Sequence, residues 1–513
     1  MKLIKFILLF FVSISLFSQN FRSEKVKNEG QILADKNNGY YKNPIFPGNY
    51  GDPSLVRVKD DYYVAFSRTN GIIIWHSKDL VNWKPVVRHR LPAGFNTVWA
   101  IDLQYFNNKF YVYMPIKVFP NKKEGAFGNF VITAEKPEGP WSEPINLDIE
   151  IPDGDYSGID PGFIQTPTGE KYLYVNHGWA MQLNDEGTKA ISKPKIVYDG
   201  WDYPKDWVVE CKCLESPKLF YKDGFYYMVS AEGGTSGPST AHMSVVARAK
   251  HPLGPWENSP YNPLTHTNNQ EEAFWHQGHG TVFEAADGTW WTIYHGRVKN
   301  FTEMGRPALL MPIEWTKDGW PIQKMGYSSN ALIPKPKGEN VGHGLPLSDN
   351  FDSKEPAIQW YYDNEKVNNF SLGNKQLKMK ASGDSFKTAS EIYNYAPNIS
   401  FEVTVKINGA SKNAISGLRL GNEGIATNGE NVFLAEGPDW RVRQSIYSLK
   451  NKKGVWLKIK NMQKDLSLFY SEDGENWIKF DCSLRAHDSY KYGLFSYGTN
   501  QVIFEEFKYQ GLE

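Results

Sequence analysis

An aromatic strand motif recurs five times between residues 60 and 296 of this 513-residue chain. The copies read DDYYVAFS (60–67), NKFYVYMP (108–115), EKYLYVNHG (170–178), DGFYYMVSAEGG (223–234) and DGTWWTIYHG (287–296). Such a repeat indicates an array of similar units, because one small unit buries its apolar face only against its neighbours. We therefore predict a five-bladed β-propeller over residues 43–334, with loops of variable length accounting for the uneven spacing.

The strand before each aromatic copy is the innermost strand of its predicted blade and lines the central channel. These five strands open on polar residues, namely Asp52, Asp102, Asp160, Glu215 and His279. The sequence predicts that the five side chains converge at one mouth of the channel. Asp52 precedes Pro53, which disfavours helical backbone, so we expect an extended backbone that fixes this carboxylate at the mouth of its strand.

The remainder of the chain predicts a second domain. Residues 20–42 form a polar leader, and residues 335–349 (KPKGENVGHGLPLSD) are rich in Pro, Gly and Lys, as a linker is. From 350 to 513, apolar and polar residues alternate over longer runs, which is typical of a two-sheet β-sandwich of the jelly-roll, concanavalin-like kind. The predicted fold class is thus all-β.

The net charge of the chain limits its possible binding partners, and its N-terminal residues indicate where the protein is targeted. The chain has 57 basic and 57 acidic residues, so nucleic acid is a poor candidate partner. Residues 1–19 resemble a cleavable signal peptide, with Lys2 and Lys5 before an apolar run (6–17) that is shorter than the ~20 residues of a membrane span. We expect a secreted or periplasmic protein without a membrane span.

The cysteines and aromatic residues are less decisive. Cys211, Cys213 and Cys482 are too few for a disulfide framework, and the Cys-X-Cys pair lacks a second pair for zinc, so we expect structural or incidental thiols. The chain has 17 Trp and 29 Tyr, which suits sugar binding because aromatic faces stack on sugar rings. However, β-proteins are rich in aromatic residues in any case.

Several carboxylates around one axis suit glycoside hydrolysis. Like charges in a buried mouth raise some of the carboxyl pKa values. Glycosidases need one carboxylic acid that protonates the leaving oxygen and one carboxylate that activates water, and a separation of roughly 6.5–9.5 Å inverts the anomeric centre. The residues alone leave open which carboxyl group is the acid and which the base.

The pattern NPIFPGNYGDPS (43–54), IDPGF (159–163), ESPKLFYKDGFYYMVSA (215–231) and GHGTVFEAADGTWWTIYHG (278–296) resembles glycoside hydrolase family 43. The resemblance implies five-bladed propellers acting on xylosyl and arabinosyl linkages. It also implies that Asp52 is the general base, that Glu215 is the general acid, and that Asp160 orients this acid and raises its pKa. The sandwich resembles the C-terminal domain of β-xylosidase-like members.

The same resemblance assigns further residues. His279 matches an axial histidine that holds a water or, in some members, a calcium ion, although calcium prefers six to eight oxygen ligands. No cofactor is required. Arg306 matches an arginine that meets sugar hydroxyls, and Trp99 matches an active-site aromatic residue, although Ile101 stands where the family usually has Pro. Asp102 is also predicted to meet the substrate.

Two departures from the family pattern surround the predicted acid. Ser216 replaces a glycine that commonly follows the acid, which is a mild change. The preceding segment, Glu210-Cys-Lys-Cys, has no familiar counterpart, and Glu210 is a rival candidate for the acid.

The sequence thus predicts a secreted, inverting exo-glycosidase that removes terminal β-xylosyl residues from plant or algal polysaccharide or its oligosaccharides. Exo action follows if the sandwich or a propeller loop closes one end of the cleft into a pocket, which the resemblance to β-xylosidase-like members implies. The alternatives are an α-L-arabinofuranosidase with the same catalytic set and a non-catalytic sugar-binding propeller.

Overall fold

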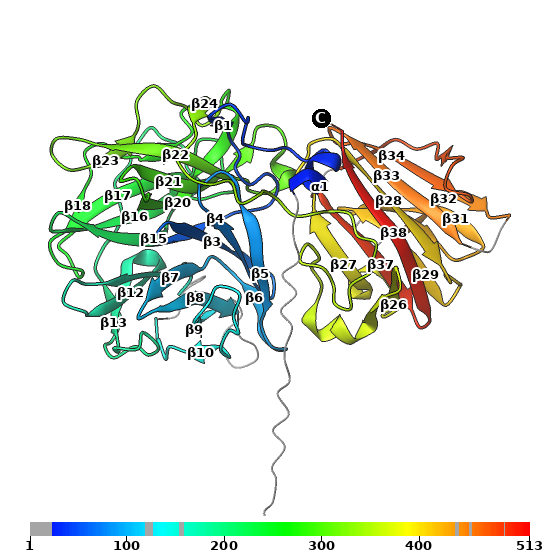
Figure 1. Cartoon of the computed structure of the whole chain (residues 1–513), viewed down its shortest axis with the longest axis horizontal. Helices are drawn as coiled ribbons and strands as arrows, with labels where there is room; N and C mark the ends of the chain where they lie inside the picture. Colours follow the sequence, from blue (N-terminus) through cyan, green and yellow to red (C-terminus); the bar gives the residue numbers. More distant parts are fainter. Residues whose placement is uncertain are drawn as a thin grey trace, which may run out of the picture.

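The protein is described here from a computed structural model, and the description covers residues 23–117, 127–152, 158–436, 441–450, 454–486 and 488–512. Two all-β domains, a propeller and a sandwich, lie side by side (Figure 1). The predicted signal peptide, residues 1–19, lies outside the described residues.

Five antiparallel sheets, each formed by strands that are close in sequence, make the five blades. Blade 1 contains β2 (Ser54–Val58), β3 (Asp61–Arg68), β4 (Gly71–Ser77) and β5 (Lys84–Arg90). Blade 2 contains β6 (Asn96–Val98), β7 (Asp102–Phe106), β8 (Lys109–Lys117), β9 (Phe127–Ala134) and β10 (Ile145–Asn146). Blade 3 contains β11 (Gly162–Gln165), β12 (Lys171–Val175), the short 3-10 helix η1 (Asn176–Gly178), β13 (Trp179–Leu183) and β14 (Lys195–Ile196).

The last two blades have the longest inner strands. Blade 4 contains β15 (Cys211–Lys222), β16 (Phe225–Gly233), β17 (Met243–Ala249), β18 (Glu257–Asn258) and β19 (Thr265–His266). Blade 5 contains β20 (Phe274–Glu284), β21 (Trp290–Val298), the 3-10 helix η2 (Thr302–Met304), β22 (Ala308–Trp315) and β23 (Pro321–Gln323). The aromatic copies form the second strand of every blade, which confirms the predicted five-bladed propeller.

Blade 5 bonds to the segment that leads into blade 1. The Thr281 hydroxyl donates to the Pro53 carbonyl at 3.0 Å, and the Ile45 amide donates to the Ala308 carbonyl at 2.9 Å. Outside the blades, β1 (Tyr40–Lys42) pairs antiparallel with β24 (Leu332–Pro334). This pairing holds the start and the end of the propeller together.

The C-terminal domain is the predicted two-sheet sandwich. One sheet contains β25 (Phe370–Gly373), β26 (Gln376–Lys380), β28 (Phe401–Asn408), β33 (Val455–Met462), β34 (Asp465–Ser471), β35 (Ile478–Lys479), β36 (Leu484–Arg485) and β38 (Gln501–Gly511). The other contains β27 (Ser390–Tyr395), β29 (Ala414–Leu420), β30 (Glu423–Thr427), β31 (Asn431–Glu436), β32 (Arg441–Ser448) and β37 (Lys491–Gly498). Its 3-10 helices are η3 (Asn364–Asn369) and η4 (Phe386–Thr388), and the short α-helix α1 (Ser23–Asn28) precedes the propeller in the sequence.

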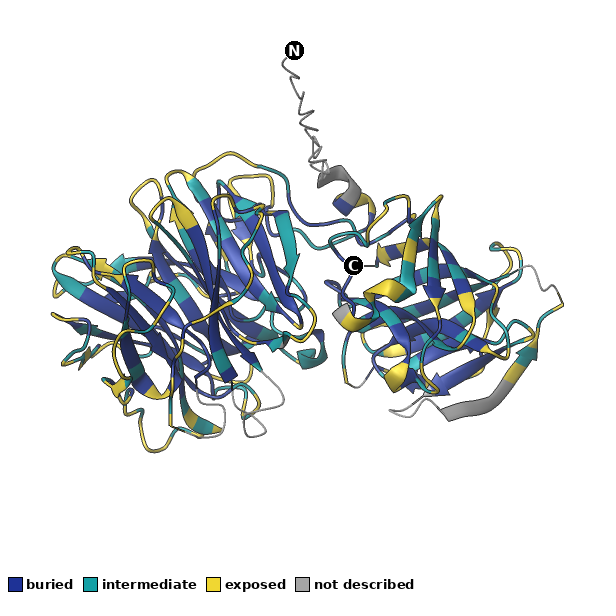
Figure 2. Ribbon diagram, turned by 90° about the horizontal axis from the view of Figure 1, so that it is seen from below, coloured by how far each residue is buried: buried dark blue, intermediate teal, exposed yellow. Residues whose placement is uncertain are grey.

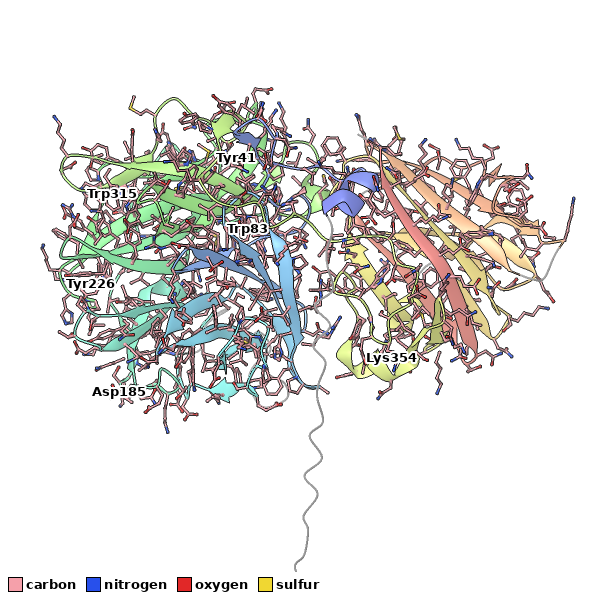
Figure 3. The ribbon with its side chains drawn as sticks, viewed as in Figure 1. Tyr41, Trp83, Asp185, Tyr226, Trp315 and Lys354 are labelled. Carbon is pink, nitrogen blue, oxygen red and sulfur yellow. A yellow bond between two sulfur atoms is a disulfide. The ribbon has the colours of Figure 1, made fainter. Side chains whose placement is uncertain are left out.

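One apolar core runs from the propeller into the sandwich. It joins Trp83 of blade 1, which is labelled in Figure 3, to Trp360 and Phe504 of the C-terminal domain, all fully buried. Figure 2 shows that burial is concentrated in the sheets of both domains, whereas exposed residues lie largely in the connections. Since burial of apolar surface stabilises by about 25 cal/mol per Å², this shared core favours a fixed placement of the two domains.

The stretch 335–349, predicted as a linker, is packed along the first blade. Leu345 and Leu347 are buried, and the Gly344 amide donates to the Trp83 carbonyl at 2.9 Å. Its Lys335 ammonium lies 3.1 Å from the buried carboxylate of Asp79. In the part of the chain described, no helix is long and apolar enough to cross a membrane.

Candidate active site

The mouth of the channel is built on left-handed backbone. Asp52, Asp160 and His279 have φ values of 58°, 57° and 54°, and Ser216, directly after Glu215, has a φ of 55°. Such backbone costs of order 1–3 kcal/mol per residue and tends to cluster at functional sites. The expectation of extended backbone at Asp52 is therefore wrong: the chain avoids the right-handed helical region before Pro53 by turning into the left-handed one.

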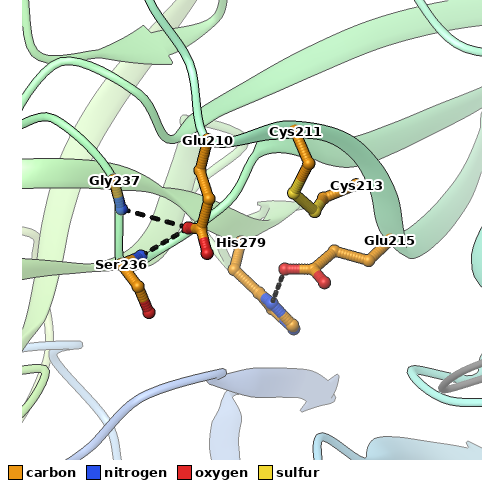
Figure 4. Close-up of a disulfide and its surroundings, with 7 residues drawn as sticks. All are labelled: Glu210, Cys211, Cys213, Glu215, Ser236, Gly237 and His279. Carbon is orange, nitrogen blue, oxygen red and sulfur yellow. Dashed lines mark hydrogen bonds and ion pairs between the residues drawn. A yellow bond between two sulfur atoms is a disulfide. The ribbon is translucent and has the colours of Figure 1, made fainter.

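Three carboxylates converge on one imidazole. The Nδ1 atom of His279 lies 3.2 Å from Oδ1 of Asp52, 4.0 Å from Oδ2 of Asp160 and 4.0 Å from Oε1 of Glu215. Figure 4 shows Glu215 and His279 pointing toward each other. The structure thus brings together four of the five residues that open the inner strands.

Asp52 is held as a carboxylate. Burial alone would raise the pKa of Asp52, but the Arg306 guanidinium and the neighbouring histidines outweigh it and hold this pKa well below its usual range. Arg306 binds both oxygens of Asp52, with Nη1–Oδ1 at 2.6 Å and Nη2–Oδ2 at 2.7 Å. A deprotonated Asp52 can accept a proton from water, which is what a general base does.

Glu215 and Asp160 are shifted in the opposite direction. Burial, with the nearby charges of Asp160 and Asp52, raises the pKa of Glu215 well above its usual range. Burial and the charge of Asp52 raise the pKa of Asp160 to about 7. Two carboxyl groups whose pKa values are pushed apart have the properties of an acid and a base, so Glu215 can donate a proton while Asp52 accepts one.

Three neutral histidines line the channel beneath these acids. Burial lowers the pKa of His279 to about 3 and that of His295 to about 4, and it lowers the pKa of His242 well below its usual range. The rings of His242 and His295 stack at 5.1 Å, and the Asp52 amide donates to His295 Nδ1 at 3.2 Å. Neither His242 nor His295 is among the site residues that the sequence predicts. The ending YHG of the fifth aromatic strand was the available signal for His295.

The histidines also bear on the predicted calcium ion. Among the described residues, two groups of potential ligands are close enough to share an ion, one of Asp52, His279 and His295 and one of Glu215, His242 and His279. Each group offers two nitrogen donors and one carboxylate. Because calcium takes six to eight oxygen ligands, these donor sets do not fit it.

Asp102 lies beneath the site rather than in the pocket, so the prediction that it meets the substrate is not supported. It is buried, and its carboxylate accepts hydrogen bonds from four donors. The donors are Ser54 Oγ (3.1 Å), Gln104 Nε2 (2.9 Å), the Phe163 amide (2.8 Å) and Lys218 Nζ (3.0 Å). These donors belong to blades 1 to 4, so Asp102 ties together the strands that carry the catalytic candidates.

A pocket of about 210 Å³ opens beside Asp52. Trp99 and Arg306 line it, as expected of sugar-binding residues, and Trp99 is 36% exposed with its ring 4.7 Å from that of Phe127. Tyr361 and Tyr395 of the sandwich complete the lining. Sequence reasoning missed both tyrosines because no motif marks a contact between two domains.

The Glu210-Cys-Lys-Cys segment differs from its prediction. Cys211 and Cys213 form a disulfide (Figure 4), so the expectation of thiols is wrong for this pair. The Glu210 carboxylate accepts hydrogen bonds from the amides of Ser236 (2.7 Å) and Gly237 (3.1 Å). These bonds hold the loop that contains Ser236 and Gly237, so Glu210 has a structural role, which argues against Glu210 as the general acid.

Comparisons with known proteins find relatives of this chain among glycosidases. A non-reducing end alpha-L-arabinofuranosidase of Bacteroides ovatus is 32% identical over 378 residues, covering 68% of this chain and 66% of that protein. A xylan 1,3-beta-xylosidase of a Vibrio species is 33% identical over 344 residues, covering 58% of this chain and 59% of that protein. The chain therefore spans less than two thirds of the length of these relatives.

Solved structures share the two-domain fold. A family 43 protein of Bacillus licheniformis matches with a TM-score of 0.79 at 24% identity, covering 92% of this chain and all of that one. A xylan beta-1,4-xylosidase of Bacillus halodurans matches with a TM-score of 0.79 at 23% identity, covering 91% and 99%. The sequence profile of glycosyl hydrolases family 43 matches residues 41–321, more than half of the chain. The chain belongs to the glycosyl hydrolases of family 43.

Proposed function

We propose that the protein is an inverting exo-glycosidase that removes terminal β-xylosyl residues from plant or algal polysaccharide or its oligosaccharides. The observation that carries this proposal is the contrast between two carboxyl groups facing one imidazole. Asp52 has its pKa held well below the usual range and Glu215 has its pKa raised well above it. This pairing supplies the base and the acid that inversion needs near neutral pH.

The proposed reaction is a single displacement. Glu215 gives its proton to the oxygen of the leaving group as the glycosidic bond breaks. Asp52 takes a proton from a water that attacks the anomeric carbon from the opposite face, so the products are the inverted sugar and the shortened chain. Asp160 is a positioning residue in this scheme, because its amide contact at Ser216 and its charge act on Glu215.

Exo action is supported by the source of the pocket lining. Tyr361 and Tyr395 come from the C-terminal domain, while Asp52, Trp99 and Arg306 come from the propeller. A pocket bounded by two domains suits the end of a chain better than its middle, because a continuing glycan would need an open path on both sides.

The second candidate sugar is α-L-arabinofuranose. It is favoured by the relative from Bacteroides ovatus, which is described as an arabinofuranosidase, whereas the relative from Vibrio is described as a xylosidase. Both sugars are pentoses, and the same acid and base serve either bond. The shape of the pocket beside Trp99 would decide between them.

The test is hydrolysis of 4-nitrophenyl β-D-xylopyranoside and of the α-L-arabinofuranoside by wild type and by the Glu215→Ala variant. We expect the xyloside to be the better of the two nitrophenyl substrates. On xylobiose, whose sugar leaving group needs a proton, we expect the variant to lose about 10²–10⁴-fold in kcat, which is the range for a lost general acid. Preference for the arabinofuranoside would exchange the two sugars. Binding of oligosaccharides by an inert wild type would favour a non-catalytic sugar-binding propeller.

We also propose that the protein is exported, to the periplasm or beyond, through a cleaved signal peptide at residues 1–19. The Cys211–Cys213 disulfide supports export because disulfides persist mainly in oxidising compartments. Mass spectrometry of the protein purified from its native host would test the proposal by locating the mature N-terminus. No cofactor has a part in the proposed reaction.

A further inference from the structure

Strand β15 reaches Glu215 through two β-bulges. Its register with β16 pairs Cys211 with Gly233, Glu215 with Ala231 and Lys218 with Val229. The strand thus has extra residues both before and after Glu215, and each bulge contains a residue with left-handed backbone, Cys213 (φ 44°) and Ser216 (φ 55°). Bulges re-aim side chains, so the direction of the Glu215 carboxyl group depends on both of them.

Each bulge has its own restraint. The bulge after Glu215 is held from blade 3, because the Ser216 amide donates to the Asp160 carboxylate. The bulge before Glu215 is closed by the Cys211–Cys213 disulfide, whose Cα atoms are 5.2 Å apart (Figure 4). The residue between the two cysteines, Lys212, is exposed and lies 3.6 Å from the exposed carboxylate of Asp202, a surface pair of little energetic weight.

Blade 5 offers an internal comparison. Strand β20 also has two bulges, with left-handed backbone at His276 (φ 51°) and His279 (φ 54°), three residues apart as in β15. There the first bulge is held by a side chain: His276 Nε2 lies 3.1 Å from the Gly237 carbonyl and 2.9 Å from the Pro238 carbonyl. In β15 the disulfide stands in the place of this polar contact.

The two bulges are also connected. Glu210, directly before the disulfide, accepts bonds from Ser236 and Gly237, in the same loop that His276 contacts. Glu210 therefore attaches the start of β15 to the loop that contains Ser236 and Gly237, while the disulfide restrains the backbone between Glu210 and Glu215. This arrangement leaves the disulfide as the covalent restraint nearest to Glu215 in the sequence.

We propose that the Cys211–Cys213 disulfide is a positioning element that aims the carboxyl group of Glu215 at the leaving oxygen. The proposal rests on the role of Glu215 as general acid given above. A proton donor must come within about 2.6–3.2 Å of its acceptor, and a misplacement of 1 Å can cost about 10²-fold in rate. Opening the disulfide lets the first bulge relax and moves the acid out of reach.

This role has a signature that general destabilisation lacks. A 4-nitrophenolate leaving group departs as a stabilised anion and needs little help from an acid, whereas the sugar leaving group of xylobiose needs its proton. Loss of acid positioning therefore lowers the rate of xylobiose hydrolysis and leaves the rate on the nitrophenyl substrate nearly unchanged. Loss of folded protein or of substrate binding reduces the hydrolysis of both substrates alike.

The experiment compares wild type with the double variant Cys211→Ser/Cys213→Ser on 4-nitrophenyl β-xyloside and on xylobiose. We expect kcat on xylobiose to fall at least tenfold while kcat on the nitrophenyl substrate changes less than twofold. Cys482→Ser, which replaces the cysteine of the sandwich, is the matched control and should change neither. An equal loss on both substrates, or no loss on xylobiose, would overturn the proposal.

A second measurement covers the case in which the double variant does not fold. Wild type is treated with dithiothreitol, which supplies two electrons and two protons, converts the disulfide into two thiols and becomes a cyclic disulfide itself. Cys211 and Cys213 are half-buried and within reach of the reagent. The rate of xylobiose hydrolysis should fall selectively and return when the disulfide is reoxidised. Thiol titration confirms that the disulfide has been reduced, and a xylobiose rate that is unchanged in the reduced protein would contradict the proposal. A wild type inert on both substrates and on their arabinose counterparts would instead refute the proposed function.

Discussion

Arg306 binds Asp52 through two parallel hydrogen bonds, at 2.6 and 2.7 Å, from the opposite end of the propeller sequence. The bidentate geometry is the strong form of an arginine–carboxylate contact. It holds Asp52 as a carboxylate, whereas at Glu215 burial and the charges of Asp160 and Asp52 outweigh the opposing effect of Arg306 and keep the pKa raised. The two ends of the propeller, blade 1 and blade 5, thus meet in the interaction that sets the charge of the proposed base.

Replacement of this arginine should move the acidic limb of the pH profile. The Arg306→Lys variant keeps the positive charge but loses the two parallel hydrogen bonds to Asp52. The pKa of Asp52 therefore rises, and the base becomes protonated at a higher pH. We expect kcat/KM to fall about tenfold at neutral pH, and its acidic limb to shift to higher pH. Arg297→Lys, at a nearby arginine whose Nη1 donates to the Thr302 carbonyl, is the control. An acidic limb that stays in place would show that Arg306 does not set the pKa of Asp52.

The repeat predicted where the inner strands begin but not where their side chains point. Asp52, Asp102 and Asp160 hold equivalent places in the pattern, yet only Asp52 and Asp160 have left-handed backbone and face His279. Asp102 lacks the positive φ and turns into the space between blades, where it meets Lys218. The composition of a strand does not determine whether one residue has left-handed backbone. Equivalent positions of the repeat therefore differ in role: Asp52 and Asp160 face His279, whereas Asp102 pairs with Lys218.

The buried pair of Lys218 and Asp102 should be essential for stability. Lys218 Nζ lies 3.0 Å from Asp102 and also donates to the carbonyls of Ile101 (2.7 Å) and Pro161 (2.9 Å). Asp102→Ala leaves a buried ammonium without its counter-charge, and we expect the free energy of unfolding to fall by about 3–5 kcal/mol. Urea denaturation measures this loss. Lys218→Met/Asp102→Leu removes both charges and should recover a part of it, while a double variant as unstable as Asp102→Ala would contradict the charge argument.

The sequence predicted the fold of the sandwich domain but not that residues of this domain line the pocket. Alternation of apolar and polar residues predicted two sheets, and two sheets are found. The contact that places Tyr361 and Tyr395 beside Asp52 depends instead on how the domains dock, with Arg88 stacked 4.0 Å from the ring of Tyr361. Such docking depends on the packing of many residues far apart in the chain, which a local pattern does not record.

Removal of a pocket tyrosine from the sandwich should weaken substrate binding. Tyr395 lines the pocket and is half-buried, with its ring 5.7 Å from that of Tyr361. In Tyr395→Ala we expect KM for the nitrophenyl xyloside to rise about tenfold with little change in kcat, since a wall of the pocket binds substrate and transition state alike. Tyr497→Ala, on the same sheet but outside the pocket lining, should leave KM unchanged. An unchanged KM in Tyr395→Ala would remove the sandwich from substrate binding.

Asp160 should lower the stability of the folded protein as pH rises. Burial and the charge of Asp52 raise its pKa from the ordinary 3.8 to about 7. Between about pH 4 and pH 7 the unfolded chain loses this proton while the folded chain keeps it, so the free energy of unfolding falls across that window and the penalty is complete above it. Asp160→Asn removes the ionisation, and its Tm should exceed that of wild type at pH 8 but not at pH 4, with loss of activity at both. Asp148→Asn, at an exposed carboxylate 3.4 Å from Lys189, is the control and should show no such divergence. A Tm difference that stays constant with pH would mean that Asp160 ionises in the folded state as it does in the unfolded chain.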